Sequence, residues 1–429
     1  MATSSWISRS MALLAVSLVN AQDLNFPFPL DATTPVPYTL SLDKAIVDEA
    51  VLKASLYRPS IDLLDGDTSN AGWLEGPPQQ DMAALAKYWA ENYDWARIQD
   101  EINSNFSHYA VNIQSSDGDV PIHFVHERSD IEDALPLLIL HGWPSTHLEW
   151  SHVINPLASP EDPTAQAFHV VAPDLPGFGF SPAPASSGLG PRRMGEAFHQ
   201  LMAQLGYEKY GVVGTDIGYL AGLSMADSFP DNVVGYLSDF WIVQPNSTDL
   251  ERNAQNQTTE EEALYIAAFT EWFGQHSSYS TVHQQAPLAI AQALTDSPVG
   301  FAGWMWHLMH AISDDYDYSF DELITDAMML WIPGVYSNVR VYKEMLKDTP
   351  ELSFVTVPTA ATQWGIPNTP FKPVRNFNNI PREWLQRSVN LVYLSRHETG
   401  GHFPAINEPE LWVGDVREFF GSLVDGSLQ

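Results

Sequence analysis

Residues 214–218 read Gly-Thr-Asp-Ile-Gly, between an apolar run at 210–213 and a helical pattern at 219–225. Small residues on both sides of an apex let a tight strand-to-helix turn push one side chain out over a sheet, as Gly-x-Ser-x-Gly does in serine hydrolases. The stretch therefore predicts a nucleophile elbow that carries Asp216 in place of serine. Taken alone, Asp216 fits equally well an aspartate that caps a helix after a buried strand. The surrounding motifs have to decide between the two.

Aspartate at this apex favours a different chemistry from serine. A serine alkoxide attacks a carbonyl carbon, whereas a carboxylate that attacks an acyl group gives only an anhydride. At saturated carbon, however, a carboxylate can displace a leaving group and form an ester intermediate. Asp216 therefore indicates a substrate with a carbon–halogen bond or a strained ether.

Short, uniformly apolar segments occur on both sides of the elbow, at 135–140, 169–172, 210–213 and 389–394. Strands buried on both faces have this composition, and helical patterns between them are typical of a parallel α/β sheet. From about 246 to 349 the sequence becomes helical and aromatic, which indicates an inserted helical cap. A cap over such a sheet places a pocket at the carboxyl ends of the strands.

The expected organisation has five segments along the chain. They are a signal peptide at 1–21, an N-terminal extension at 22–130, the first part of the α/β core at 131–245, the cap at 246–349 and the second part of the core at 350–429. The extension ends in a period-two pattern at 120–126, which predicts a strand.

The chain is strongly acidic, with 20 Lys and Arg against 53 Asp and Glu and a formal net charge of −33. Such a surface repels phosphate backbones and anionic lipids, which argues against nucleic acid as a partner. With 429 residues, of which 45% are hydrophobic, the chain can bury a large core. No metal-ligand motif or phosphate loop stands out, so the sequence predicts neither a metal nor an organic cofactor.

The N-terminus has one basic residue before an apolar run at 11–19 and small residues that end at Ala21. This pattern is typical of a secretory signal peptide, and the run is too short to span a bilayer. We expect cleavage after Ala21 and secretion, with an uncleaved anchor as the alternative. Three Asn-x-Ser/Thr sequons fit passage through a glycosylating compartment: Asn105, Asn246 and Asn256.

Residues 141–144 read His-Gly-Trp-Pro and follow directly on the apolar segment at 135–140. In a fold with an elbow, the first strand-to-helix loop supplies a backbone N–H that faces the developing oxyanion, together with the N–H of the residue after the nucleophile. The predicted donors are the amides of Trp143 and Ile217. Pro144 has no N–H, and a cis bond before it would turn the Trp143 amide inward.

Residues 399–403, Thr-Gly-Gly-His-Phe, follow the last predicted strand, where a general base has to return to the nucleophile. The chain has 14 histidines, most of which we expect to be structural or exposed. His402 stands apart because the glycines before it let its loop approach closely. We expect His402 to activate the water that attacks the ester on Asp216.

With these motifs, the chain resembles the epoxide hydrolases of microsomal type within the α/β-hydrolase superfamily. The stretches at 88–89 and 93–95 are similar to the N-terminal extension of that family, and residues 174–181, Asp-Leu-Pro-Gly-Phe-Gly-Phe-Ser, match its loop before the elbow helix. The resemblance covers nearly everything after the signal peptide. It implies an α/β-hydrolase fold with a mostly parallel central sheet, an inserted helical cap and an N-terminal extension.

The same resemblance implies two cap tyrosines that donate hydrogen bonds to the epoxide oxygen. Tyr342, in the stretch Arg-Val-Tyr-Lys-Glu at 340–344, matches the second of them. Tyr279, four residues before His283, matches the first, although the arginine that the family has before the next proline is Ala286 here. A phenol with a pKa near 10 can protonate an alkoxide as the ring opens.

The sequence departs from the family at the acid that normally orients the base. Matching the segment at 380–384 places that acid at Asn376, and residues 374–379 contain no carboxylate. An amide can orient an imidazole but does not offset its positive charge. Either Asp239, near the end of the strand after the elbow helix, has taken over the role, or the acid has been lost.

The sequence thus predicts a secreted epoxide hydrolase that acts on a small apolar epoxide. A haloalkane-type dehalogenase is one alternative, and it would need halide-binding N–H donors in place of the two phenols. The other is a weakened protein that binds a ligand or opens an epoxide in a specific pathway, which Asn376 and Ala286 motivate. Several large cap side chains indicate either an apolar pocket or ordinary cap core: Trp304, Trp306, Met328, Met329 and Trp331.

Overall fold

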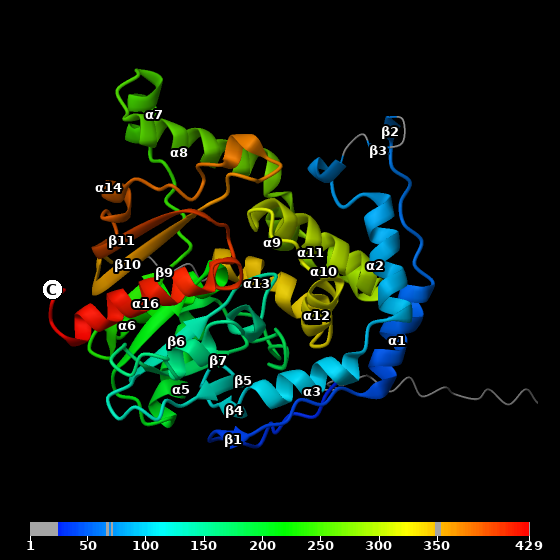
Figure 1. Cartoon of the computed structure of the whole chain (residues 1–429), viewed down its shortest axis with the longest axis horizontal. Coiled ribbons are helices and arrows are strands. Elements are labelled where there is room, and N and C mark those ends of the chain that lie inside the picture. The colour runs from blue at the N-terminus through cyan, green and yellow to red at the C-terminus, as the bar shows by residue number, and fades with distance from the viewer. Residues whose placement is uncertain (1–24, 66–67, 70–71, 348–352, 429) are drawn as a thin grey trace, which may run out of the picture.

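One central sheet of nine strands organises the part of the chain that this computed structural model describes, residues 25–65, 68–69, 72–347 and 353–428 (Figure 1). The spatial order is β1-β4-β5-β7-β6-β8-β9-β10-β11. The bounds are β1 Val36–Pro37, β4 His108–Ile113, β5 Val120–Glu127, β6 Leu135–Leu140, β7 Phe168–Pro173, β8 Tyr210–Gly214, β9 Val233–Ser238, β10 Val355–Gly365 and β11 Val389–Gly400. A separate ribbon pairs β2 (Leu64–Asp65) with β3 (Thr68–Ser69).

The predicted mostly parallel sheet is confirmed. All pairings from β7 through β6, β8, β9 and β10 to β11 are parallel. At the other edge, β1 pairs antiparallel with β4, β4 with β5, and β5 with β7. The N-terminal extension therefore lengthens the sheet at one edge and does not form a sheet of its own.

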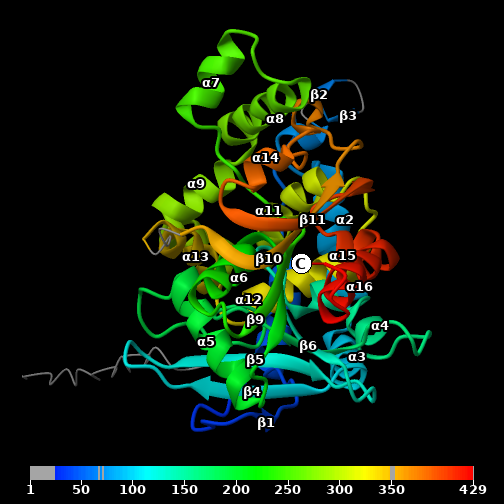
Figure 2. The ribbon, with the colours of Figure 1, turned by 90° about the vertical axis from the view of Figure 1, so that its left-hand side faces the viewer.

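The parallel strands β6, β7 and β8 are mostly buried on both faces, which explains their apolar sequences. Leu138 of β6 and Val212 of β8 belong to one core cluster, while their neighbours Leu137 and Val213 belong to a second cluster across the sheet. The first face is covered by α5 (Pro191–Gln204) and α6 (Asp216–Ser228), and the second by α4 (Ile154–Ala158) and α16 (Pro409–Val424). Figure 2 shows these helices on the two sides of the sheet.

Seven α-helices between β9 and β10 form the cap. They are α7 Ser247–Ala254, α8 Glu260–Glu271, α9 Ser278–Gln285, α10 Pro287–Asp296, α11 Pro298–Ile312, α12 Phe320–Trp331 and α13 Val335–Lys347, with a short π-helical segment at Trp272–His276. Local capping explains where two of them begin. Thr259 with Glu262 and Ser319 with Glu322 form reciprocal capping boxes at the starts of α8 and α12.

The N-terminal extension also joins the cap to the sheet. Its helices are α1 (Lys44–Ser55), α2 (Gln79–Glu91) and α3 (Trp95–Asn105), of which α1 and α2 pack against cap helices α11 and α12 (Figure 1). Two ion pairs cross this contact, with Lys53 Nζ 2.9 Å from Asp296 and Arg97 2.6 Å from Asp321. The cap is thus held from two sides, by the sheet and by the extension.

The structure decides one further sequence expectation and leaves another untested. The large cap side chains Met328, Met329 and Trp331 are buried in the core of the cap, which decides for the packing interpretation. The predicted signal peptide at 1–21 lies outside the described residues. Among the helices that the structure describes, none is long and apolar enough to cross a membrane.

Candidate active site

The elbow between β8 and α6 presents Asp216 at its apex. The residue has a φ of 47°, in the left-handed region that only a forced turn imposes on a side-chain-bearing residue. Both flanking positions have to be glycine, because a side chain at either one would collide with a neighbouring backbone carbonyl. A Cβ on Gly214 would collide with the carbonyl of Gly218, and one on Gly218 would collide with the carbonyl of Leu140. The small residues that predict the elbow are therefore required by its packing.

Two backbone amides face the Asp216 carboxylate, as predicted for the oxyanion site. The Trp143 amide donates to Oδ1 at 3.0 Å, and the Ile217 amide also stabilises the carboxylate. The peptide bond between Trp143 and Pro144 is cis. Burial raises the pKa of Asp216 to about 6, and the two amides act in the opposite direction. The nucleophile is thus ionised near neutral pH but poorly hydrated.

Both predicted tyrosines reach the same place from the cap. Tyr279 lies on α9 and Tyr342 on α13, with ring centroids 5.8 Å apart and planes at 85°. Tyr279 stacks on the Trp143 indole at 5.5 Å, and Tyr342 meets that indole edge-on at 6.1 Å. The Tyr342 hydroxyl is buried without a hydrogen-bond partner among the described residues. Burial, followed by the charges of Tyr279 and Asp216, raises the pKa of Tyr342 well above its usual value.

These groups line one cavity of about 390 Å³ between cap and core. Its wall is largely aromatic and aliphatic, with contributions from Phe240, Leu308 and Phe377. The polar lining residues other than the reacting groups are neutral: Gln244, Ser280, Gln284 and Asn378. No lysine or arginine is among the described residues that line it. The cavity therefore suits an uncharged ligand.

His402 enters this cavity from the loop after β11. Gly400 and Gly401 precede it with φ values of 112° and 67°, and its amide donates to the Ile312 carbonyl at 2.8 Å. Nε2 lies 3.8 Å from Oδ2 of Asp216, and the ring meets Phe240 edge-on at 5.1 Å. Burial lowers the pKa of His402 to about 4, so the imidazole is neutral near pH 7 and can accept a proton.

The acid that would orient His402 is not found at either predicted place. Asn376 accepts a hydrogen bond from Asn379, at 3.3 Å. Oδ2 of Asp239 accepts from the Trp412 indole at 2.7 Å, while Oδ1 is buried without a partner. The described residues show no hydrogen bond or ion pair between Asp239 and His402. The relocated role of Asp239 stays a prediction.

Two buried side chains beside the site were not singled out by any sequence motif. Glu149 is buried with both carboxylate oxygens unpartnered among the described residues, and burial raises its pKa well above the usual value. His283 packs against Trp143 and Tyr342, with ring centroids 4.8 and 5.0 Å apart, and its Nε2 accepts from Trp304 at 3.1 Å. The only sequence signal for His283 is its position one helical turn after Tyr279.

Comparisons with known proteins show which family the chain belongs to. The family described as "Epoxide hydrolase N terminus" matches residues 35–150, and the "alpha/beta hydrolase fold" family matches residues 136–283. The chain is 31% identical over 368 residues to a protein of Stigmatella aurantiaca named as an epoxide hydrolase, covering 82% of this chain and 78% of that one. It is 29% identical to epoxide hydrolase 1 of Sus scrofa over 80% of each chain.

A solved structure shows the same similarity in three dimensions. The crystal structure of juvenile hormone epoxide hydrolase from the silkworm Bombyx mori superposes with a TM-score of 0.80 and 26% identity, covering 92% of this chain and 96% of that one. The α/β-hydrolase fold implied by the sequence is confirmed. The chain therefore belongs to the epoxide hydrolases, which are hydrolases that act on ether bonds.

Proposed function

We propose that this epoxide hydrolase works through a covalent ester on Asp216. A carboxylate oxygen of Asp216 attacks one ring carbon, the bond from that carbon to the epoxide oxygen breaks, and the alkoxide takes a proton from Tyr279 or Tyr342. The product of this step is a hydroxyalkyl ester. Burial supports the step, because a poorly hydrated carboxylate is a stronger nucleophile and the phenols supply the proton where water is scarce.

In the second step, His402 takes a proton from a water molecule whose oxygen attacks the ester carbonyl. The tetrahedral oxyanion forms where the Trp143 and Ile217 amides already face the carboxylate. Collapse breaks the bond between the carbonyl carbon and the alkyl oxygen, and His402 returns its proton to that oxygen. A vicinal diol leaves, and the proton on the regenerated Asp216 carboxyl returns to the tyrosinate formed in the first step. Asp216 is then again a carboxylate and the phenol is restored.

One observation carries this proposal: Asp216, His402 and both phenols line a single apolar cavity. The dehalogenase alternative is weaker for a structural reason. A halide site would need free N–H donors beside the nucleophile, but the Trp143 indole already donates to Asn338 at 3.2 Å. Binding without turnover remains the second candidate, because the described residues show no hydrogen bond from Asn376 or Asp239 to His402.

The substrate class follows from the cavity wall. Its volume of about 390 Å³ and its neutral polar residues fit an uncharged, largely apolar epoxide. An epoxide with a carboxylate would lose its hydration without gaining a cationic partner.

We also propose secretion and glycosylation, which rest on the sequence pattern at 1–21 and on the sequons. All three sequon asparagines are exposed: Asn105, Asn246 and Asn256. Asn246 uses its side-chain oxygen to cap α7, by accepting from the Asp249 amide at 2.9 Å. A glycan on its nitrogen would leave that cap in place. Expression in a secreting cell, followed by glycan release and mass measurement, tests both proposals.

A single turnover in ¹⁸O-labelled water tests the covalent route. Water oxygen that attacks the ester carbonyl has to enter the Asp216 carboxylate, whereas direct attack on the epoxide puts the label only in the diol. Peptide mass analysis of the segment around Asp216 separates the two. Absence of label from the protein after one turnover would exclude the ester mechanism.

A further inference from the structure

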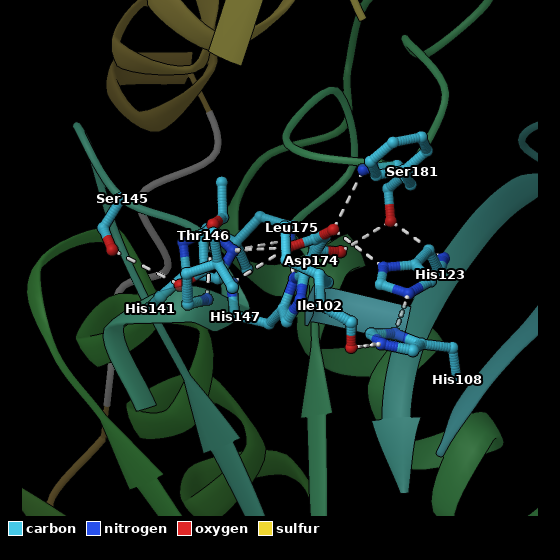
Figure 3. A network of polar contacts seen from close by, with 12 residues as sticks. Ile102, His108, His123, His141, Ser145, Thr146, His147, Asp174, Leu175 and Ser181 are labelled. Atoms are coloured by element: carbon cyan, nitrogen blue, oxygen red, sulfur yellow. Dashed lines mark hydrogen bonds and ion pairs between the residues drawn. The ribbon is translucent and has the colours of Figure 1, made fainter. Parts of the chain in front are cut away.

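Asp174, in the loop after β7, is the centre of a buried polar network outside the cavity (Figure 3). Each of its carboxylate oxygens accepts two hydrogen bonds. Oδ1 accepts from the amide and from Nδ1 of His147, at 2.9 and 2.8 Å. Oδ2 accepts from Nδ1 of His123 at 2.8 Å and from the Phe180 amide at 2.9 Å. All acceptor positions of an ionised carboxylate are thus filled.

A row of two histidines continues from Asp174 into the N-terminal extension. Nε2 of His123, on β5, lies 2.9 Å from Nδ1 of His108, on β4. Nε2 of His108 in turn lies 3.0 Å from the Ile102 carbonyl. His123 is completely buried and His108 nearly so. Figure 3 shows the row running from Asp174 through both rings to Ile102.

The row cannot be built from two neutral imidazoles. The Ile102 carbonyl has no proton, so Nε2 of His108 has to carry one, and a neutral His108 then offers a lone pair at Nδ1. At the other end, Nδ1 of His123 has to carry a proton to bond ionised Asp174, and a neutral His123 also offers a lone pair at Nε2. Two lone pairs would then face each other at 2.9 Å. One additional proton on either ring turns this contact into a hydrogen bond.

The same network holds the loop that carries the oxyanion donor. The Leu175 amide donates to Nε2 of His141 at 3.0 Å, at the start of that loop. Asp174 binds the amide and ring of His147 at its end. Between these two anchors, the Trp143 amide donates to Asp216. The direction of that amide therefore depends on where the Asp174 segment lies.

A metal ion is a poorer explanation of the cluster. Nitrogen and oxygen atoms of His123, His147 and Asp174 lie close enough together to suggest a site. However, the nitrogens contact the carboxylate directly at 2.8 Å, and the backbone amides of His147 and Phe180 occupy its remaining lone pairs. The described residues leave no free position on Asp174 for a cation.

We propose that the His108–His123 row holds one shared proton as a buried imidazolium opposite ionised Asp174, and that this ion pair positions the Trp143 amide for catalysis. The positioning part rests on the proposed role of Trp143 as an oxyanion donor. His108, His123 and Asp174 are positioning residues, because none of them lines the cavity.

Other charged and titratable groups around the row are few. The rings of His147 and Tyr38 lie 5.0 and 5.6 Å from that of His123. Burial opposes ionisation of Asp174, but the charges and bonds of His147 and His123 outweigh it and hold its pKa well below the usual range. Burial, with a smaller effect of the charge of His147, lowers the pKa of His123, although the bond and charge of Asp174 act in the opposite direction. Burial and the charges of His123 and His147 lower the pKa of His108 to about 3. The geometry of the row opposes these effects of burial, because removing the proton would leave two lone pairs facing each other at 2.9 Å.

Nitrogen NMR of the whole protein, labelled with ¹⁵N in its imidazole rings, tests whether the row holds the additional proton. The measurement does not require turnover. At pH 7 we expect one ring of the row to show two protonated nitrogens. The variants His108→Gln and His123→Gln assign the signals by their loss. Two neutral rings would overturn the shared proton, whatever the outcome for the covalent mechanism.

Two substitutions of His108 test the positioning. Glutamine can accept from His123 and donate to Ile102, so His108→Gln should keep kcat close to that of the wild type. Phenylalanine preserves the stacked ring but offers neither bond, so His108→Phe should lower kcat about tenfold or more, with KM changed less than about threefold. His126→Phe is the matched control, since it removes another buried histidine of β5 that bonds Tyr207 and not the row.

The results for these variants either support or overturn the positioning role of His108. Loss of kcat in His108→Phe with recovery in His108→Gln supports the proposal. Equal kcat in His108→Phe and the wild type overturns the positioning role. An equal loss in His126→Phe would also overturn it, because general destabilisation of the paired strands β4 and β5 would then explain the effect. If His108→Phe does not fold, the NMR measurement and His108→Gln still decide.

Discussion

Nε2 of His402 lies 3.8 Å from Oδ2 of Asp216, which is too far for a hydrogen bond. The imidazole therefore does not hold the nucleophile as a proton partner would. The separation suits a base that acts on a water molecule placed beside the ester carbonyl. The two residues thus serve different steps, and substitutions should separate those steps.

Replacing the base should trap the intermediate. In His402→Gln, alkylation of Asp216 should proceed while ester hydrolysis slows by about 10²-fold or more, because general base catalysis is lost. Intact mass after mixing with a simple aryl epoxide should show the added mass of the epoxide. His397→Gln is the control, since His397 bonds Asp415 at 2.6 Å outside the cavity. An adduct that is equally persistent in both variants would argue against a base role for His402.

Removing a phenol should slow the first step. Tyr279→Phe and Tyr342→Phe should each reduce the alkylation rate by about 10²-fold, because the alkoxide loses a proton donor. Tyr342→Phe should raise the free energy of unfolding by about 1 kcal/mol, since it removes a buried hydroxyl that has no partner in the described structure. Tyr265→Phe provides the contrast: it loses a bond to the Val243 carbonyl, worth about 1 kcal/mol, without affecting the rate. Stopped-flow alkylation and urea unfolding measure the two quantities.

The pH dependence of alkylation should report Asp216. Only the carboxylate attacks, and burial raises its pKa to about 6, so the rate should fall as pH decreases through about 6. His402 does not cause this fall in rate, because burial lowers its pKa to about 4. Single-turnover rates between pH 4.5 and 9 provide the profile. A rate that stays constant down to pH 4.5 would contradict the assignment.

The raised pKa of Asp216 also predicts how the stability of the fold depends on pH. The pKa of Asp216 is higher in the folded state than the usual value of 3.8 for a free aspartate, so its ionised form destabilises the fold. This penalty is absent below pH 3.8, grows between 3.8 and about 6, and is complete above. Asp216→Asn should therefore raise the free energy of unfolding at pH 8 by at most about 3 kcal/mol and have no effect near pH 4. Asparagine also tolerates the positive φ.

Urea unfolding at pH 4, 6 and 8 measures this gain. Asp100→Asn, at an exposed position on α3, should show no such pH-dependent difference. A gain that is the same at all three values would mean that burial of the charge is not its cause.

The role of Asp239 can be tested by an isosteric change. If Asp239 supports the imidazolium, Asp239→Asn should leave alkylation intact and slow hydrolysis, by up to the factor of about 10⁴ known for the same change in a serine protease. Asp415→Asn, which removes a buried acid that bonds His397, is the control. Unchanged steady-state turnover in Asp239→Asn would exclude the role.

Much of the fold and site can be predicted from the sequence because the decisive features are local. The elbow needs small residues around Asp216, the oxyanion loop follows a strand directly, and His402 follows glycines. Each of these is a short pattern with a steric reason. The two tyrosines needed the resemblance to the family, because the chain has 16 tyrosines and no local pattern distinguishes these two.

The features that the sequence did not predict depend on contacts between distant segments. The strand β10 was not predicted, because its polar residues Thr359, Thr362 and Gln363 are buried by neighbours that no local pattern reveals. The bond from Trp412 to Asp239 joins residues 173 positions apart. The His108–His123–Asp174 row likewise depends on the pairing of β5 with β7.

The neutral, mostly apolar wall of the cavity also affects the end of the catalytic cycle. An epoxide only accepts hydrogen bonds, whereas a vicinal diol carries two hydroxyl donors that need partners. The wall supplies few of them, chiefly the amides of Gln244, Gln284 and Asn378. The diol therefore gains more from bulk water than the epoxide does, and its departure is favoured over rebinding even as it accumulates.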